Sequence, residues 1–230
     1  MNATTLKWIA LVTMTIDHIG FFLISSDAPL YLTTRVIGRV AFPIFAFMIA
    51  QGFIHTKNRM NYAIRLLVFG IVVEAIFIGI YLLTSINYSI VPFPGGYPLS
   101  IAWSLIAGLL GLMFIHSKNR FFYFLLLPLL IASYFLQYSF YGFIMIIIFG
   151  LSIPMDKKIN YVGLLTLFYV FYPLAFNARY EEINTIQLFA IFALGLIYLY
   201  NGQKGKGYKY LFYIYYPLHI VILFLIGYLF

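Results

Sequence analysis

An acidic residue and a histidine, Asp17 and His18, stand side by side in an otherwise apolar run near the start of the chain. An ionisable side chain in hydrocarbon costs at least ~2.5 to 3.5 kcal/mol on insertion scales, so such residues usually pair and mark function. Imidazole is half neutral near physiological pH and can take a proton from a reacting group. His18 is therefore a candidate general base, and we expect Asp17 to meet Arg39 or His219 on a neighbouring helix.

Other polar residues interrupt later apolar runs, at Arg39, Gln51, Glu74 and His219. Counting ~1.5 Å per residue from the expected cytoplasmic ends, the four ionisable groups His18, Arg39, Glu74 and His219 lie ~15 to 24 Å deep. They belong to four different runs. The sequence therefore predicts one polar layer, a little outside the membrane midplane.

Two prolines fall beside this layer. A proline inside a helix leaves the carbonyl four residues earlier without its N–H donor, which for Pro43 is Arg39 and for Pro217 is Tyr213. Unpaired carbonyls persist in a membrane only beside protein donors or a water-filled cavity. A polar cavity is expected, although Arg39 paired with Glu74 or Asp17 is also compatible with a purely structural ion pair.

The composition is that of a membrane protein. Of 230 residues, 64% are hydrophobic and only 9% are charged, and the mean hydropathy is +0.99. Runs of about 20 apolar residues predict membrane-spanning helices. We expect an all-α, polytopic bundle in a single domain over residues 1–230, with about nine spans near residues 5–25, 35–55, 61–84, 98–116, 121–136, 139–154, 160–176, 185–201 and 209–230.

The net charge of +8 comes mainly from short loops, which argues against nucleic-acid binding. Basic residues fill every second connection, whereas the alternate connections hold Arg35 and Arg179 with Asp27, Glu181 and Glu182. The positive-inside rule then places the N-terminus in the cytoplasm and the C-terminus outside. We expect a multi-pass protein of a bacterial inner membrane.

The loop Asn201–Lys209 combines three glycines with three lysines. It lacks the spacing of a P-loop, and attraction to anionic lipid and binding of phosphate are equally compatible with it. The chain has no cysteine, which excludes thiolate chemistry, and no spaced histidine motif predicts a metal.

Four motifs together resemble the TraX family of membrane proteins. They are "MTIDHIG", "RVIGRVAFPIFAFMIAQGFIHTKNRMNYAIRL", "IQLFAIFALGLIYLYNGQKGKG" and "YIYYPLHIVIL". The likeness extends from Lys7 to the last helix. The family is known for acetylating the N-terminal amine of pilin, and it is related to membrane acyltransferases with a first-helix histidine at the reaction centre.

The resemblance, together with the polar layer and the basic loops, implies which residues carry the function. His18, Asp17, Arg39 and His219 would form the catalytic group, with Gln51, Glu74 and Tyr216 in support. Cytoplasmic basic residues would bind the phosphates of acetyl-CoA, namely Lys57, Arg59, Arg65, Lys204 and Lys206. Arg39, His219 or Tyr216 would donate to the thioester oxygen.

The expected activity is transfer of acetyl from cytoplasmic acetyl-CoA to an amine or hydroxyl of an exported or membrane-embedded acceptor. A pilin-like peptide or an envelope component is the expected partner, alongside membrane lipid. Two alternatives use the same residues differently: a proton-coupled transporter, and a non-catalytic scaffold for a pilus or secretion system. The sequence leaves the oligomeric state open.

Overall fold

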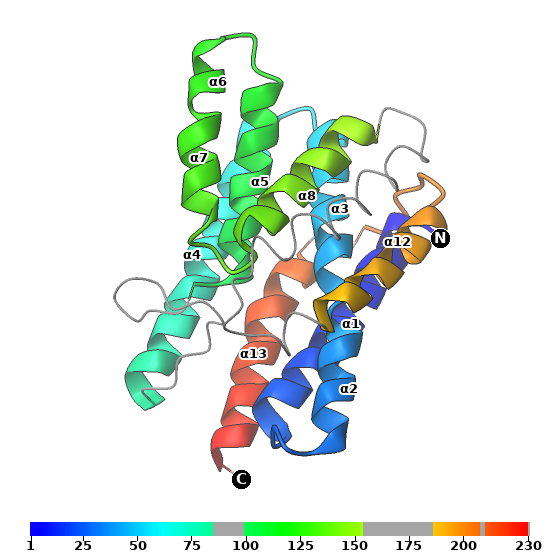
Figure 1. Cartoon of the computed structure of the whole chain (residues 1–230), viewed down its shortest axis with the longest axis vertical. Helices are drawn as coiled ribbons and strands as arrows, with labels where there is room; N and C mark the ends of the chain where they lie inside the picture. Colours follow the sequence, from blue (N-terminus) through cyan, green and yellow to red (C-terminus); the bar gives the residue numbers. More distant parts are fainter. Residues whose placement is uncertain (85–98, 154–185, 208–209, 230) are drawn as a thin grey trace. The chain divides into compact units, whose positions relative to one another are not determined.

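The computed structural model describes residues 1–84, 99–153, 186–207 and 210–229. Every regular element in this part of the chain is helical (Figure 1). The elements are α1 (Ala3–Leu23), α2 (Pro29–Gly38), α3 (Ala41–His55), α4 (Arg59–Thr84), α5 (Ile101–Ile115), α6 (Phe121–Phe124), α7 (Leu126–Ser133), α8 (Ser139–Ser152), the 3₁₀ helix η3 (Leu188–Ile191), α12 (Phe192–Tyr198) and α13 (Leu211–Leu229).

The all-helical prediction is confirmed for the described residues, and the expected runs there contain helix. Four stretches are long and apolar enough to cross a membrane, namely Ala3–Leu23, Pro29–His55, Arg59–Ile80 and Phe212–Leu229. The remaining apolar helices are shorter. The expected run at 160–176 lies outside the described residues, so nine spans and the orientation of the termini stay predictions.

The chain divides into two compact units. Unit 1 comprises Met1–Met48 and Ala178–Phe230, and unit 2 comprises Ile49–Asn177. In unit 1, α1 packs against both α2 and α13 (Figure 1). Unit 1 therefore brings the first predicted apolar run, which contains Asp17 and His18, together with the last one, which contains His219.

Glycines allow this close packing of α1. A Cβ on Gly20 would lie 1.9 Å from Thr34 Oγ1 of α2, and one on Gly38 would lie 2.2 Å from Asp17 Cβ of α1. A Cβ on Gly227 of α13 would lie 2.6 Å from the carbonyl oxygen of Phe22. Contacts this short leave no room for a side chain, so glycine is required on each face.

The second apolar run begins earlier than the sequence predicted, at Pro29 instead of residue 35. Proline suits the first turn of a helix because its missing N–H would have no partner there. Arg35, expected in an outer connection, therefore lies inside α2 and is 7% exposed. That expectation was wrong because apolar composition alone does not locate a helix start.

The two prolines have different effects. Pro43 was expected to lie inside a continuous helix. Helix α2 instead ends at Gly38 and α3 starts at Ala41, so Pro43 lies in the first turn of α3. Pro217 does lie inside α13. Only Pro217 therefore has the predicted mid-helix position.

In unit 2, α5 packs against α4, α6, α7 and α8. A Cβ on Gly108 would lie 2.4 Å from Ile146 of α8, and one on Gly150 would lie 2.3 Å from Leu112 of α5. Small residues on facing helices let backbones approach closely in membrane proteins. The packed helices α5 and α8 therefore form the core of unit 2.

We predict that Gly38→Ala destabilises the protein, because the new methyl group overlaps Asp17 in a closely packed contact. Overpacking of this kind typically costs ~1 to 3 kcal/mol. Thermal unfolding of detergent-purified protein measures the effect. Gly195→Ala in α12 is the matched control, since its added Cβ would meet no atom within 4 Å. Equal melting temperatures for the two variants would contradict the packing argument.

Candidate functional site

A buried ion cluster joins α1 to α2. Asp17 Oδ2 lies 3.0 Å from Arg35 Nη1, and Asp17 Oδ1 lies 2.8 Å from Arg39 Nη2. The exposed fractions are 8% for Asp17, 7% for Arg35 and 4% for Arg39. Asp17 thus contacts Arg39, one of the two neighbours expected from the sequence, and Arg35 as well.

The backbone fixes this cluster in place. Arg39 Nε donates to the carbonyl of Arg35 at 3.0 Å, which satisfies a carbonyl in the last turn of α2. Arg35 Nη1 also donates to the carbonyl of Asp17 at 3.3 Å. Both arginines therefore bind a main-chain carbonyl as well as the Asp17 carboxylate, and the carbonyl that Arg35 binds directly precedes His18.

Gln187 completes the cluster from the start of the eighth predicted run. Its Oε1 accepts from Arg39 Nη1 at 3.4 Å, and the residue is 3% exposed. Neither Gln187 nor Arg35 was predicted from the sequence as part of the site. The spacing of Arg35 and Arg39 was a usable signal, because residues four apart share one helix face.

His18 and His219 form a direct pair. His18 Nδ1 lies 2.7 Å from His219 Nε2, and the ring centroids are 5.0 Å apart with planes only 19° from parallel. The nitrogen atoms face each other almost in plane, which suits a hydrogen bond. The sequence placed these two residues in one layer, and the structure brings them into contact.

The two histidines differ in the surroundings of the ring nitrogen that lies outside their mutual contact. His219 Nδ1 lies 2.9 Å from the carbonyl oxygen of Tyr215, so both nitrogens of His219 are engaged and His219 is 6% exposed. Nε2 of the half-buried His18 forms no hydrogen bond with any described residue. His219 therefore has no N–H left to donate to a thioester oxygen, whereas His18 has one nitrogen available.

Tyr216 packs beside the histidine pair. Its ring centroid lies 6.5 Å from that of His18 and 5.5 Å from that of His219, in both cases edge-on. Tyr216 is 8% exposed. Of the three donors expected for the thioester oxygen, it is thus the one whose ring borders both imidazoles.

Glu74 belongs to unit 2 and has its own partners there. Its Oε2 accepts from the N–H of Ser100 at 2.9 Å and from Trp103 Nε1 at 2.8 Å. Ser100 is the residue that precedes α5, so the carboxylate lies at the positive end of that helix. These contacts give Glu74 a structural role in joining α4 to α5.

The glycine loop encloses the start of the chain in unit 1. Ala3 N donates to Gln203 O at 2.8 Å, and Asn201 N donates to Met1 O at 2.8 Å. Gly202 and Gly205 have φ of +80° and +71°, and a Cβ on Gly205 would lie 2.6 Å from Asn2 Oδ1. Lys204 and Lys206 are exposed on this loop. The loop and the N-terminus therefore lie at one end of unit 1.

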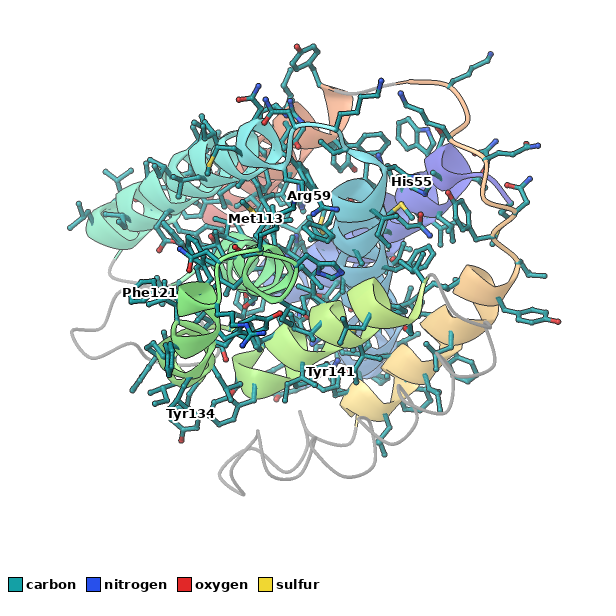
Figure 2. All side chains as sticks on the ribbon, turned by 90° about the horizontal axis from the view of Figure 1, so that it is seen from above. His55, Arg59, Met113, Phe121, Tyr134 and Tyr141 are labelled. Carbon is teal, nitrogen blue, oxygen red and sulfur yellow. The ribbon has the colours of Figure 1, made fainter. Side chains whose placement is uncertain are left out.

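The other predicted cofactor residues lie in unit 2, around the turn between α3 and α4. His55 and Arg59 flank this turn (Figure 2), and Lys57 within it is exposed. The Arg59 guanidinium lies 4.1 Å from the centroid of Phe53, whose ring is 5.0 Å from that of His116.

Gln51 and Arg65 border the same turn from α3 and α4. Arg65 lies over Tyr62 at 5.9 Å, and Gln51 Oε1 is buried with no hydrogen-bond partner. In the described part of the chain no group of three His, Asp or Glu residues is arranged to hold a metal ion.

Apolar helices of spanning length and a buried ionic and histidine site define an all-helical membrane protein. A family model described as "TraX protein" matches residues 2–227. The chain therefore belongs to the TraX family, and the match covers both units.

Two curated relatives are similar to the chain. The "Probable fimbrial assembly protein FimC, serogroup H1" of Dichelobacter nodosus is 24% identical over 233 aligned positions, which cover 96% of this chain and 94% of the relative. The "Uncharacterized protein RP591" of Rickettsia prowazekii (strain Madrid E) is 35% identical over 69 positions, covering 30% of this chain and 24% of that protein. No solved structure matches the chain.

We predict that Asp17→Asn destabilises the protein more than any exposed acid-to-amide change. Removing one partner of a buried ion pair typically costs ~3 to 5 kcal/mol, because the remaining charge is left uncompensated. The melting temperature and the monodisperse yield in detergent both measure this loss. Asp27→Asn is the matched control, since Asp27 is exposed in the same unit. A stable Asp17→Asn protein would contradict the assignment.

Proposed function

We propose that this TraX-family protein is a membrane acetyltransferase. It transfers an acetyl group from cytoplasmic acetyl-CoA to an amine, or a hydroxyl, of an exported or membrane-embedded acceptor such as the N-terminus of a pilin-like peptide. The observation that carries the proposal is the hydrogen-bonded pair of His18 and His219, which leaves Nε2 of His18 available.

His18 acts as the general base in this reaction. Its Nε2 takes a proton from the acceptor amine as the amine nitrogen attacks the thioester carbonyl carbon. The carbon–sulfur bond breaks, and the departing thiolate receives that proton from His18. The products are an N-acetylated acceptor and free CoA, so the base is regenerated in each cycle.

His18 has the environment that such a base requires. Its other nitrogen is oriented by His219, and a base oriented by a further group is a recurring arrangement in acyl transfer. Asp17 serves the same site indirectly, because its carboxylate binds Arg35 and Arg39 and so fixes α1 next to His18.

Lys204 and Lys206 are the proposed contacts for the phosphates of acetyl-CoA. Both are exposed beside the N-terminus of α1, where the helix dipole also favours an anion. With ~1.5 Å per residue, His18 lies ~20 Å along α1 from Thr4, which contacts this loop. The long pantetheine arm would cover that depth, with the loop on the cytoplasmic side of a bacterial inner membrane.

Lys57, Arg59 and Arg65 are proposed to bind phosphates at the α3–α4 turn. Gln51 beside them is the proposed supporting residue, because its Oε1 is buried without a hydrogen-bond partner. Arg39, expected in the catalytic group, is proposed to support the site through the ion cluster with Asp17. Tyr216 borders the base and is the proposed donor to the thioester oxygen.

A pilin-like acceptor is supported by the family and by one relative's name. The Dichelobacter nodosus relative is named as a probable fimbrial assembly protein, and fimbriae are built from exported pilin subunits.

A proton-coupled transporter would also use a buried histidine pair. Solute flux in proteoliposomes without acetyl transfer would favour that alternative.

We predict that His18→Ala lowers acetyl transfer by ~10² to 10⁴, which is the usual effect of losing a general base. The variant should still fold and bind acetyl-CoA, because His18 is only half-buried and has no part in the ion cluster. Transfer of labelled acetyl to a co-expressed acceptor measures turnover, and equilibrium binding measures affinity.

His55→Ala is the control for His18→Ala, since His55 is exposed at the end of α3. It should retain normal transfer. Near-normal turnover in folded His18→Ala protein would remove His18 from the mechanism.

We predict that Lys204→Glu combined with Lys206→Glu weakens acetyl-CoA binding. The loss should be largest at low ionic strength, where charge attraction is screened least. The double change Lys118→Glu and Arg120→Glu reverses the same charge at exposed positions of unit 2 and should leave affinity unchanged. Equal affinities for wild type and the Lys204 and Lys206 variant at low salt would refute the loop assignment.

A further inference from the structure

Tyr215 contacts the histidine pair through its backbone and its ring. Its carbonyl oxygen lies 2.9 Å from His219 Nδ1, and its ring lies 5.2 Å from the His219 ring with planes 16° apart. Its hydroxyl lies 2.7 Å from Thr15 Oγ1 of α1. Tyr215 therefore borders His219 with both its backbone and its ring, and it is tied to the helix that carries His18.

The carbonyl of Tyr215 fixes the direction of the hydrogen bonds. A carbonyl oxygen can only accept, so His219 Nδ1 carries the hydrogen. Neutral His219 then has an unprotonated Nε2, which must accept from its neighbour. His18 Nδ1, 2.7 Å away, is accordingly the donor, and Nε2 of neutral His18 is left with a lone pair.

The direction of the Thr15 contact follows from the same reasoning. Thr15 Oγ1 lies 2.8 Å from the carbonyl oxygen of Leu11, which can only accept, so Thr15 donates its hydrogen there. Its oxygen then accepts from the hydroxyl of Tyr215. One ordered chain of donors therefore runs from Tyr215 to Leu11, and another from His18 through His219 to the backbone of Tyr215.

We infer that Tyr215 and Thr15 are positioning residues that select Nε2 of His18 as the base nitrogen. This inference rests on the proposed function, because it specifies how the base is prepared. A free neutral imidazole prefers its hydrogen on Nε2, which would leave no lone pair facing the substrate. The Tyr215 ring and its hydroxyl bond to Thr15 keep His219 in the plane of His18, and so hold both rings in the less common Nδ1–H form.

Histidine ¹⁵N NMR on labelled protein in detergent tests the inference without any acetyl transfer. The chain has four histidines, so single histidine-to-glutamine variants assign the signals. Protonated and unprotonated ring nitrogens differ widely in chemical shift. The expected result is an Nδ1–H form for both His18 and His219. An Nε2–H form of His18 in the folded wild-type protein would overturn the inference.

Three variants test the positioning residues themselves. Tyr215→Phe removes the hydroxyl and keeps the ring, Thr15→Val removes the acceptor and keeps the shape, and Thr15→Ser retains the hydroxyl. Tyr215→Phe and Thr15→Val should increase the Nε2–H signal of His18 and lower kcat ~10-fold, less than the ~10² to 10⁴ expected for complete loss of a base. KM for acetyl-CoA should not change, and Thr15→Ser should behave like wild type.

Failure of this inference differs from failure of the proposed function. Wild-type tautomers and kcat in both Tyr215→Phe and Thr15→Val would overturn the positioning role while leaving His18 as the base. The expected tautomers together with normal transfer in His18→Ala would overturn the base assignment instead. If Tyr215→Phe fails to fold, the comparison of Thr15→Val with Thr15→Ser decides the matter alone.

Discussion

The contact of the Asp17 carboxylate with Arg35 and Arg39 is the constraint on which the rest of unit 1 depends. Three ionisable side chains below one-tenth exposure are tolerated in an apolar environment only when they satisfy each other. Their contact requires α1 and α2 to approach closely, which in turn requires glycine at positions 20 and 38. Because Arg35 and Arg39 also bind backbone carbonyls, the cluster fixes the main chain on both sides of the contact.

Adjacent residues on α1 therefore have separate tasks. Side chains of neighbouring helix positions point ~100° apart, so Asp17 faces α2 while His18 faces α13. The charged groups hold the helices together, and the two imidazoles pair with each other. A proton taken up by His18 in the proposed reaction would break no ion pair of the cluster, since both ion pairs of Asp17 among the described residues are with arginines.

The sequence predicted the participants in this site better than their contacts. Polar residues inside apolar runs identified Asp17, His18, Arg39 and His219, because burial of such groups is costly enough to be informative. Arg35 was missed because the start of α2 at Pro29 cannot be derived from apolar composition. Thr15 and Tyr215 gave no signal, since both residue types are common in membrane helices and their role depends on tertiary contacts. Glu74 was grouped with the others by depth alone, whereas its hydrogen bonds join α4 to α5.

Helix α1 also links the two ends of the proposed reaction. Its first residues are hydrogen-bonded to the glycine loop, and His18 lies more than three turns further along the same helix. A continuous helix keeps that separation nearly constant, because its rise per residue is fixed by backbone hydrogen bonds. The loop lysines and the base are therefore set apart by helix geometry and not by loop length. An acyl donor bound at the loop would need a long, flexible arm to deliver its thioester, and this requirement favours acyl-CoA over a compact acetyl donor.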